Sequence, residues 1–177
     1  SGKKGSGKTL LALNLVQSVS SGLDFLGLKT NQTKALFISL EMGPRTIQTR
    51  LGESRIPWSP EKVQFHWSWP RLPEGAEALE SFIEAHKIGL TFVDVIAKIR
   101  SRGSDWSDYG SAYEQFGPLR EIAQRTDSSI VLLTHERKGE EGEDPTERIL
   151  GSIGLSGNAG VLLSLRRMIH QGTGALE

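Results

Sequence analysis

The N-terminal end of the sequence carries glycine, lysine and hydroxyl residues at a spacing suited to binding phosphate. Residues 2–9, Gly-Lys-Lys-Gly-Ser-Gly-Lys-Thr, match the pattern G-x-x-x-x-G-K-[ST] at every fixed position. Glycines in such a loop let backbone N–H groups turn inward around phosphate oxygens, and the N-terminus of the following helix favours the same anions. The pattern predicts that Lys8 reaches the β- and γ-phosphates of ATP and that Thr9 Oγ1 binds Mg²⁺. The residues expected to contact the nucleotide are Gly2, Gly5, Ser6, Gly7, Lys8, Thr9 and Leu10.

Three polar residues farther along the chain each follow a short apolar run. Glu41, Asp94 and His135 come after runs that end at residues 40, 93 and 134. Such runs are typical of strands in a parallel sheet, and open α/β sheets bind their ligands at the carboxyl ends of the strands. We therefore expect these three side chains to converge on the phosphates.

Each of the three has a chemical role that its residue type allows. Asp94 is the natural acid to hold the Mg²⁺ hydration shell, Glu41 can polarise the attacking water, and His135 can hydrogen-bond the γ-phosphate. Structural alternatives stay open for all of them. Asp94 can be an ordinary acid at a strand end, Glu41 an acid at the start of the helix opened by Pro44, and His135 a structural histidine with satisfied hydrogen bonds.

The elements that would position these residues follow from the apolar pattern. Helices are predicted at residues 9–19, 44–54, 76–86 and 113–125. Strands are predicted at residues 35–40, 63–67, 90–93, 130–133 and 161–165. The dipeptide Gly117-Pro118 should interrupt or restart the last helix. Residues 100–110 and 136–148 are polar and contain glycine, so we expect a mobile loop and an exposed loop there.

Strands that alternate with helices predict one α/β domain over residues 1–177, with a mostly parallel sheet and helices on both faces. The phosphate-binding pattern begins directly after Ser1, whereas such a loop normally follows a buried strand. We therefore expect the leading strand and some C-terminal strands of the full fold to be truncated.

The composition limits the classes of function. Lys plus Arg and Asp plus Glu each number 21, so the formal net charge is zero. Because a broad nucleic-acid-binding surface is normally basic, any DNA contact must come from local basic loops. The absence of cysteine excludes disulfides, thiolate metal sites and thiol nucleophiles. No apolar run approaches the roughly 20 residues that span a bilayer, so we expect a cytoplasmic protein without membrane contact.

Several segments resemble a known group of ATPases. Ile-Ser-Leu-Glu-Met at residues 38–42, followed by Arg50-Leu51, resembles the S-L-E-M segment of DnaB-type replicative helicases. Residues 134–138 and 149–157 resemble the late segments of RepA-type plasmid and phage ATPases. These proteins belong to the RecA-like group, whose members form rings or filaments and couple ATP hydrolysis to DNA movement.

The resemblance implies a RecA-like P-loop fold, with Glu41 as the catalytic glutamate, Asp94 as the Walker B acid and His135 as the γ-phosphate sensor. It also implies that Arg137 and Lys138 lie near a subunit interface or face DNA. The implied ligands and partners are ATP, Mg²⁺, single-stranded DNA and further copies of the chain in a hexameric ring. No arginine finger can be assigned.

A basic cluster gives a second candidate contact with DNA. Lys98, Arg100 and Arg102 lie just before Trp106 and Tyr109, and basic residues interleaved with aromatic ones can grip a single strand. The alternative is a solvated loop with an aromatic anchor. The two tryptophans at residues 67 and 69 are expected to pack under a surface loop.

Three functions are compatible with these patterns. The first is an ATPase motor, in the manner of a replicative helicase, that moves on single-stranded DNA. The second is a regulatory or recombination ATPase in which ATP controls assembly and no unwinding occurs. The third is a nucleotide-binding scaffold without catalysis, which the presence of Lys8, Thr9, Glu41 and Asp94 argues against.

Overall fold

The computed structural model describes residues 1–2, 5–103, 109–135 and 157–165. Its centre is a four-stranded sheet in the order β2-β1-β3-β4, in which every neighbouring pair is parallel. The strands are β1 (Lys34–Ser39), β2 (Val63–His66), β3 (Ile88–Asp94) and β4 (Ser129–Leu133). The predicted α/β class with a parallel sheet is therefore confirmed.

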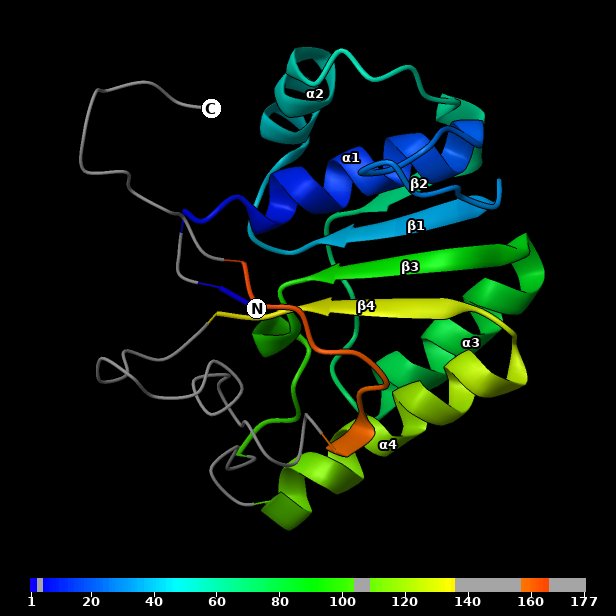
Figure 1. The fold of residues 1–177 in the computed structure, drawn as a ribbon. Coiled ribbons are helices and arrows are strands. Elements are labelled where there is room, and N and C mark those ends of the chain that lie inside the picture. The colour runs from blue at the N-terminus through cyan, green and yellow to red at the C-terminus, as the bar shows by residue number, and fades with distance from the viewer. Residues whose placement is uncertain (3–4, 104–108, 136–156, 166–177) are drawn as a thin grey trace.

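Four α-helices cover the sheet in two layers (Figure 1). They are α1 (Lys8–Ser21), α2 (Pro44–Glu53), α3 (Glu74–His86) and α4 (Tyr109–Arg125). Helices α1 and α2 lie on one face of the sheet, and α3 and α4 lie on the other (Figure 1). Two short 3₁₀ turns, Pro60–Lys62 and Ile96–Lys98, precede β2 and follow β3.

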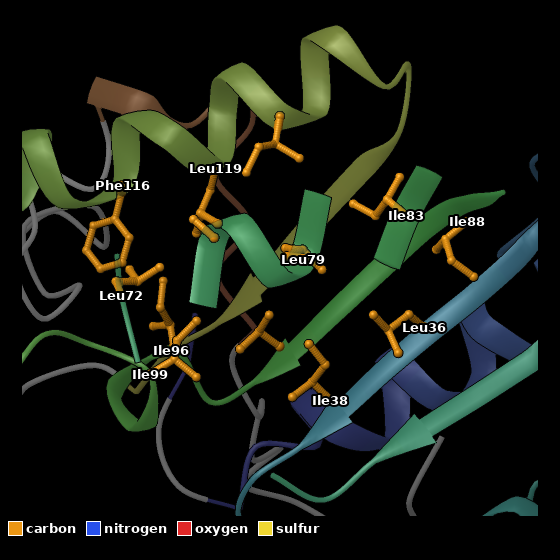
Figure 2. Packing of buried hydrophobic residues seen from close by; sticks show 13 residues of the cluster. Leu36, Ile38, Leu72, Leu79, Ile83, Ile88, Ile96, Ile99, Phe116 and Leu119 are labelled. Atoms are coloured by element: carbon orange, nitrogen blue, oxygen red, sulfur yellow. The ribbon is translucent and has the colours of Figure 1, made fainter. Parts of the chain in front are cut away.

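Successive side chains of β1 point to opposite faces of the sheet, so the strand contributes to the hydrophobic core on each face. Leu36 and Ile38 point to the α3 and α4 side, whereas Ala35 and Phe37 point to the α1 and α2 side. All four are fully buried, as a strand covered on both faces requires. Figure 2 shows the core on the α3 and α4 side of the sheet, in which strand residues contact leucine, isoleucine and phenylalanine side chains from these two helices.

Helix α4 corrects one prediction from the sequence, because it runs through Gly117-Pro118 without a break. Proline lacks an N–H and removes the hydrogen bond to the carbonyl four residues earlier. Pro118 and Glu114 are both exposed, so the unpaired carbonyl of Glu114 can bond water. Phe116 and Leu119, on either side of Pro118, are buried in one core cluster, and this packing holds the two halves of the helix in line.

The predicted strand at residues 161–165 is also wrong, since these residues form no regular structure. The Ser1 ammonium donates a hydrogen bond to Leu163 O at 2.6 Å, and Leu165 N–H donates one to Ser1 O at 2.9 Å. These two backbone hydrogen bonds join the segment to Ser1, but residues 161–165 are not assigned to a strand. Val161 and Leu163 remain 76% and 73% exposed.

The outer edge of β4 pairs with no strand in the described ranges. An apolar pocket of about 700 Å³ lies beside it and is lined by residues of α1, α4, β4 and the 158–165 segment. None of the helices in the described part of the chain is both long and apolar enough to cross a membrane. The division into one domain over residues 1–177 stays a prediction.

Candidate functional site

Residues 2 and 5–7, in the described part of the chain before α1, have a backbone that only glycine can build at key positions. Gly2, Gly5 and Gly7 have φ angles of 156°, 82° and 96°, a region that other residues rarely adopt. A Cβ atom on Gly2 would lie 2.6 Å from Leu165 O and 2.7 Å from Ser6 Oγ. The backbone therefore approaches its neighbours too closely for a side chain at this position.

This loop leads into α1, and the backbone N–H groups of the first turn of α1 point out of the N-terminal end of the helix. Gly7 is the N-cap in a left-handed conformation, and no side chain caps the helix. Ser6 Oγ is buried and has no hydrogen-bond partner in the part of the chain that the structure describes. An orphaned buried hydroxyl beside uncapped N–H groups is a setting that an anion would satisfy. The loop therefore fits the phosphates of a nucleotide.

The register of the sheet brings the three polar residues of the sequence analysis to one edge. Ser39 pairs with Asp94, and Asp94 pairs with Leu133, so the ends of β1, β3 and β4 lie in one row. Leu40 N–H donates a hydrogen bond to Asp94 O at 2.6 Å and extends this row beyond β1. Glu41 and His135 each lie two residues past their strands, so their side chains meet at the same edge of the sheet.

Asp94 and Thr9 form the buried part of the site. Thr9 Oγ1 donates a hydrogen bond to Asp94 Oδ2 at 2.7 Å, and Asp94 is only 2% exposed. Burial raises the pKa of the Asp94 carboxyl, and the nearby charge of Glu41 adds to this effect. The Thr9 hydrogen bond and the charge of Lys8 act in the opposite direction and lower this pKa.

These two side chains fit a bound Mg²⁺. Mg²⁺ prefers hydroxyl and carboxylate oxygens, keeps several waters and uses few protein ligands. Thr9 Oγ1 and one Asp94 oxygen would hold it directly or through water. A cation placed there would also offset the desolvation that disfavours the ionised carboxylate. Within the described ranges, no three acidic, histidine or cysteine side chains are placed so that together they could hold a metal ion.

Lys8, His135 and Glu41 form a connected line across the mouth of the loop. Lys8 Nζ donates to the carbonyl oxygen of Gly2 and lies 3.3 Å from His135 Nδ1. His135 Nε2 lies 3.4 Å from Glu41 Oε1 and 3.3 Å from Oε2. The structure therefore brings Lys8, His135 and Glu41 together, and their roles toward a nucleotide stay predictions.

Sequence reasoning did not find the residue that joins the two helices behind the site. Gln17 on α1 is fully buried, and its Nε2 donates to Leu51 O at 3.3 Å and to Ile56 O at 3.1 Å. Its Oε1 accepts a hydrogen bond from Ser54 Oγ at 2.7 Å. The amide thereby fixes α1, which follows the phosphate loop, to the end of α2, which follows Glu41. The only signal in the sequence is a polar residue beside the buried positions of an amphipathic helix.

The candidate DNA-contact residues lie apart from this line. Lys98, Arg100 and Arg102 are exposed on the segment after β3. Arg71 Nη1 donates to Arg100 O at 2.9 Å, and Ser101 Oγ donates to Leu72 O at 2.7 Å, so this segment is anchored to the loop before α3. Three further candidates, Trp106, Arg137 and Lys138, lie outside the described residues, and only the backbone of Tyr109 is described, as the first residue of α4.

The two tryptophans near β2 differ from each other. Trp69 packs against the α3 and α4 core and donates from Nε1 to Gly75 O at 2.9 Å, so the predicted packing role is confirmed for it. Trp67 is 40% exposed and stacks on Phe65, with ring centroids 5.9 Å apart. Only one of the pair is therefore a core residue.

A comparison with protein families identifies the family to which this fold and site belong. The sequence model of a family described as an AAA domain matches residues 1–141. The matched range includes the phosphate loop, all four strands and the three polar residues at their ends. No curated protein matches the chain.

Proposed function

The chain belongs to the AAA domain family, and we propose that it is a Mg²⁺-dependent ATPase in which Glu41 carries the hydrolytic step. The observation that carries this proposal is the meeting of five side chains at one sheet edge. Thr9 and Asp94 are joined by a buried hydrogen bond, and Lys8, His135 and Glu41 form a line of contacts beside them.

The arrangement supplies each part that phosphoryl transfer to water needs. The loop amides and Lys8 bind the β- and γ-phosphates and offset the charge that develops during transfer. Thr9 and Asp94 would hold Mg²⁺, which would supply further positive charge next to the phosphate oxygens. Glu41 takes a proton from the attacking water while the oxygen of this water bonds to the γ-phosphorus. The bond between the γ-phosphorus and the bridging oxygen breaks, and ADP and phosphate are released.

We propose further that this ATPase is a motor of the RecA-like group that acts on single-stranded DNA as a hexameric ring. Support comes from the S-L-E-M segment around Glu41 and from the resemblance of residues 134–138 and 149–157 to RepA-type ATPases. The exposed Lys98, Arg100 and Arg102 provide the local basic surface that a chain of zero net charge needs to hold DNA.

The neutral net charge favours a second candidate, in which ATP switches the assembly of a regulatory or recombination protein. Phosphate release by the full chain with Mg²⁺, with and without single-stranded DNA, separates the two. Stimulation by DNA supports the motor, and a strand-displacement assay then reports unwinding. Turnover that ignores DNA supports the switch. Tight MgATP binding without turnover would instead leave a nucleotide-binding scaffold.

A further inference from the structure

The contacts of His135 connect the phosphate-binding lysine with the hydrolytic carboxylate. One ring nitrogen, Nδ1, lies 3.3 Å from Lys8 Nζ, and the other, Nε2, lies 3.3 Å and 3.4 Å from the two oxygens of Glu41. The side chains of His135 and Glu41 are 29% and 34% exposed, so the ring is held between partners rather than free in solvent.

The chemistry of the partners fixes the direction of these hydrogen bonds. A lysine ammonium can only donate, so Nδ1 must accept from Lys8. Nε2 then carries the ring proton and donates it to Glu41, which as a carboxylate can only accept. The line therefore runs from the ammonium through a neutral imidazole to the carboxylate, with every donor facing an acceptor.

Binding of the γ-phosphate competes with this line at Lys8. The ammonium has three protons, and Gly2 O and His135 Nδ1 already accept from it. Lys8 must turn these protons toward phosphate oxygens to act in the predicted way. The imidazole then loses its donor at Nδ1, and its orientation toward Glu41 loses one of its two supports.

We propose that His135 is a positioning residue that orients Glu41 toward the attacking water and competes with the γ-phosphate for the protons of Lys8. The proposal rests on the ATPase function proposed above. It makes a prediction that a simple γ-phosphate contact does not make. If His135 only bound the γ-phosphate, its loss would weaken nucleotide binding, whereas loss of a competitor for Lys8 strengthens it.

The test is the affinity of the full chain for a non-hydrolysable ATP analogue with Mg²⁺, measured by calorimetry, together with turnover of ATP. We expect His135→Ala and His135→Phe to bind the analogue about threefold to tenfold more tightly, the range that loss of one competing hydrogen bond gives. We expect turnover to fall at the same time, because Glu41 is no longer oriented. The phenylalanine keeps the ring volume if alanine impairs folding.

Two controls define the result. His135→Gln keeps an acceptor for Lys8 and a donor for Glu41, so it should retain an affinity close to that of the unchanged chain. His86→Ala removes a histidine that stacks on Phe82 at the end of α3, and it should change neither affinity nor turnover. Tighter binding of the alanine and phenylalanine variants with slower turnover supports the proposal.

Unchanged or weaker binding of both His135→Ala and His135→Phe would overturn the positioning role and leave the ATPase proposal intact. Failure of the unchanged chain to bind the analogue, or equal binding by Lys8→Ala, would reject the ATPase proposal and the positioning role with it. The two failures are thus distinguished within one set of measurements.

Discussion

Thr9 Oγ1 donates a 2.7 Å hydrogen bond to Asp94 Oδ2, and this bond joins the first turn of α1 to the end of β3. It places a hydroxyl and a carboxylate together behind the phosphate loop. Because both oxygens suit Mg²⁺, the same contact that orders the site also orders its metal ligands.

Thr9→Ala tests this contact. We expect it to raise the Mg²⁺ concentration for half-maximal ATP turnover by at least about tenfold, since about 1.4 kcal/mol of lost ligand interaction corresponds to that factor. Asp94 also loses a buried donor, so the free energy of unfolding should fall by about 1–3 kcal/mol. Thr9→Ser keeps the hydroxyl and is the control. Equal Mg²⁺ dependence of the alanine and serine variants would contradict the assignment.

Asp94 predicts a pH dependence of stability in the absence of Mg²⁺. Burial raises the pKa of its carboxyl above the ordinary value of 3.8, so the folded chain holds this proton to higher pH than the unfolded chain does. Between those two pKa values the folded state binds more protons, and the free energy of unfolding contributed by Asp94 therefore decreases as pH rises. Full stability from this group is present below 3.8 and is lost above the raised pKa.

Asp94→Asn removes the decrease in the free energy of unfolding that ionisation of the buried carboxyl causes. Its amide oxygen still accepts from Thr9, so we expect a higher melting temperature than the unchanged chain at pH 7 with EDTA, and little difference near pH 4. Turnover of ATP should be lost in the same variant. A melting temperature at pH 7 equal to or below that of the unchanged chain would show that burial of the Asp94 charge does not limit stability.

Much of the site follows from the sequence because it depends on local patterns. The glycine spacing predicts the loop around residues 2–9, and the apolar runs predict the strands whose ends carry Glu41, Asp94 and His135. The parallel register then brings these ends together. Prediction of the strands alone places the three residues together, since the carboxyl ends of all strands in a parallel sheet lie at one edge.

The rest depends on contacts between distant segments, which a linear pattern does not contain. Gly117-Pro118 predicts a break from local chemistry, but packing of Phe116 and Leu119 keeps α4 continuous. The 161–165 run has strand composition, yet it forms no strand and is joined to Ser1 by backbone hydrogen bonds. The contact of His135 with both Lys8 and Glu41 spans residues that are far apart in the chain.

Two amides on α1 allow a matched test of the link between the helices. The buried amide of Gln17 makes three hydrogen bonds to the end of α2 and the segment after it. Asn14 Oδ1 is buried without a partner in the described part of the chain. Removing a satisfied buried group leaves its partners unpaired, which costs about 1–3 kcal/mol for each such group. We expect Gln17→Ala to lower the free energy of unfolding by about 2–4 kcal/mol, in line with that cost.

Asn14→Ala should cost clearly less than Gln17→Ala, because no hydrogen bond of the Asn14 oxygen is lost. Urea unfolding of both variants gives the comparison. A larger loss for Asn14→Ala than for Gln17→Ala would contradict the role given to Gln17.

Pro118 offers a test of how packing overrides a helix breaker. Pro118→Ala restores an N–H that can bond the carbonyl of Glu114, and alanine has the highest helix propensity. The variant should unfold at a temperature several degrees higher, since about 1 kcal/mol shifts the melting point of a domain of this size by roughly 2–4 °C. Part of the gain is offset because alanine makes the unfolded chain more flexible. An unchanged or lower melting temperature would mean that Pro118 does not destabilise α4.

The central claim is that Glu41 activates the water that attacks ATP. The most direct measurement is phosphate release from MgATP in a single turnover by the full chain and by Glu41→Gln, with nucleotide binding measured in parallel. The account predicts that Glu41→Gln binds MgATP at least as well as the unchanged chain and releases phosphate about 10²–10⁴-fold more slowly, the usual contribution of a general base. Phosphate release at the rate of the unchanged chain, with binding retained, would contradict the account and assign the hydrolytic step to another carboxylate.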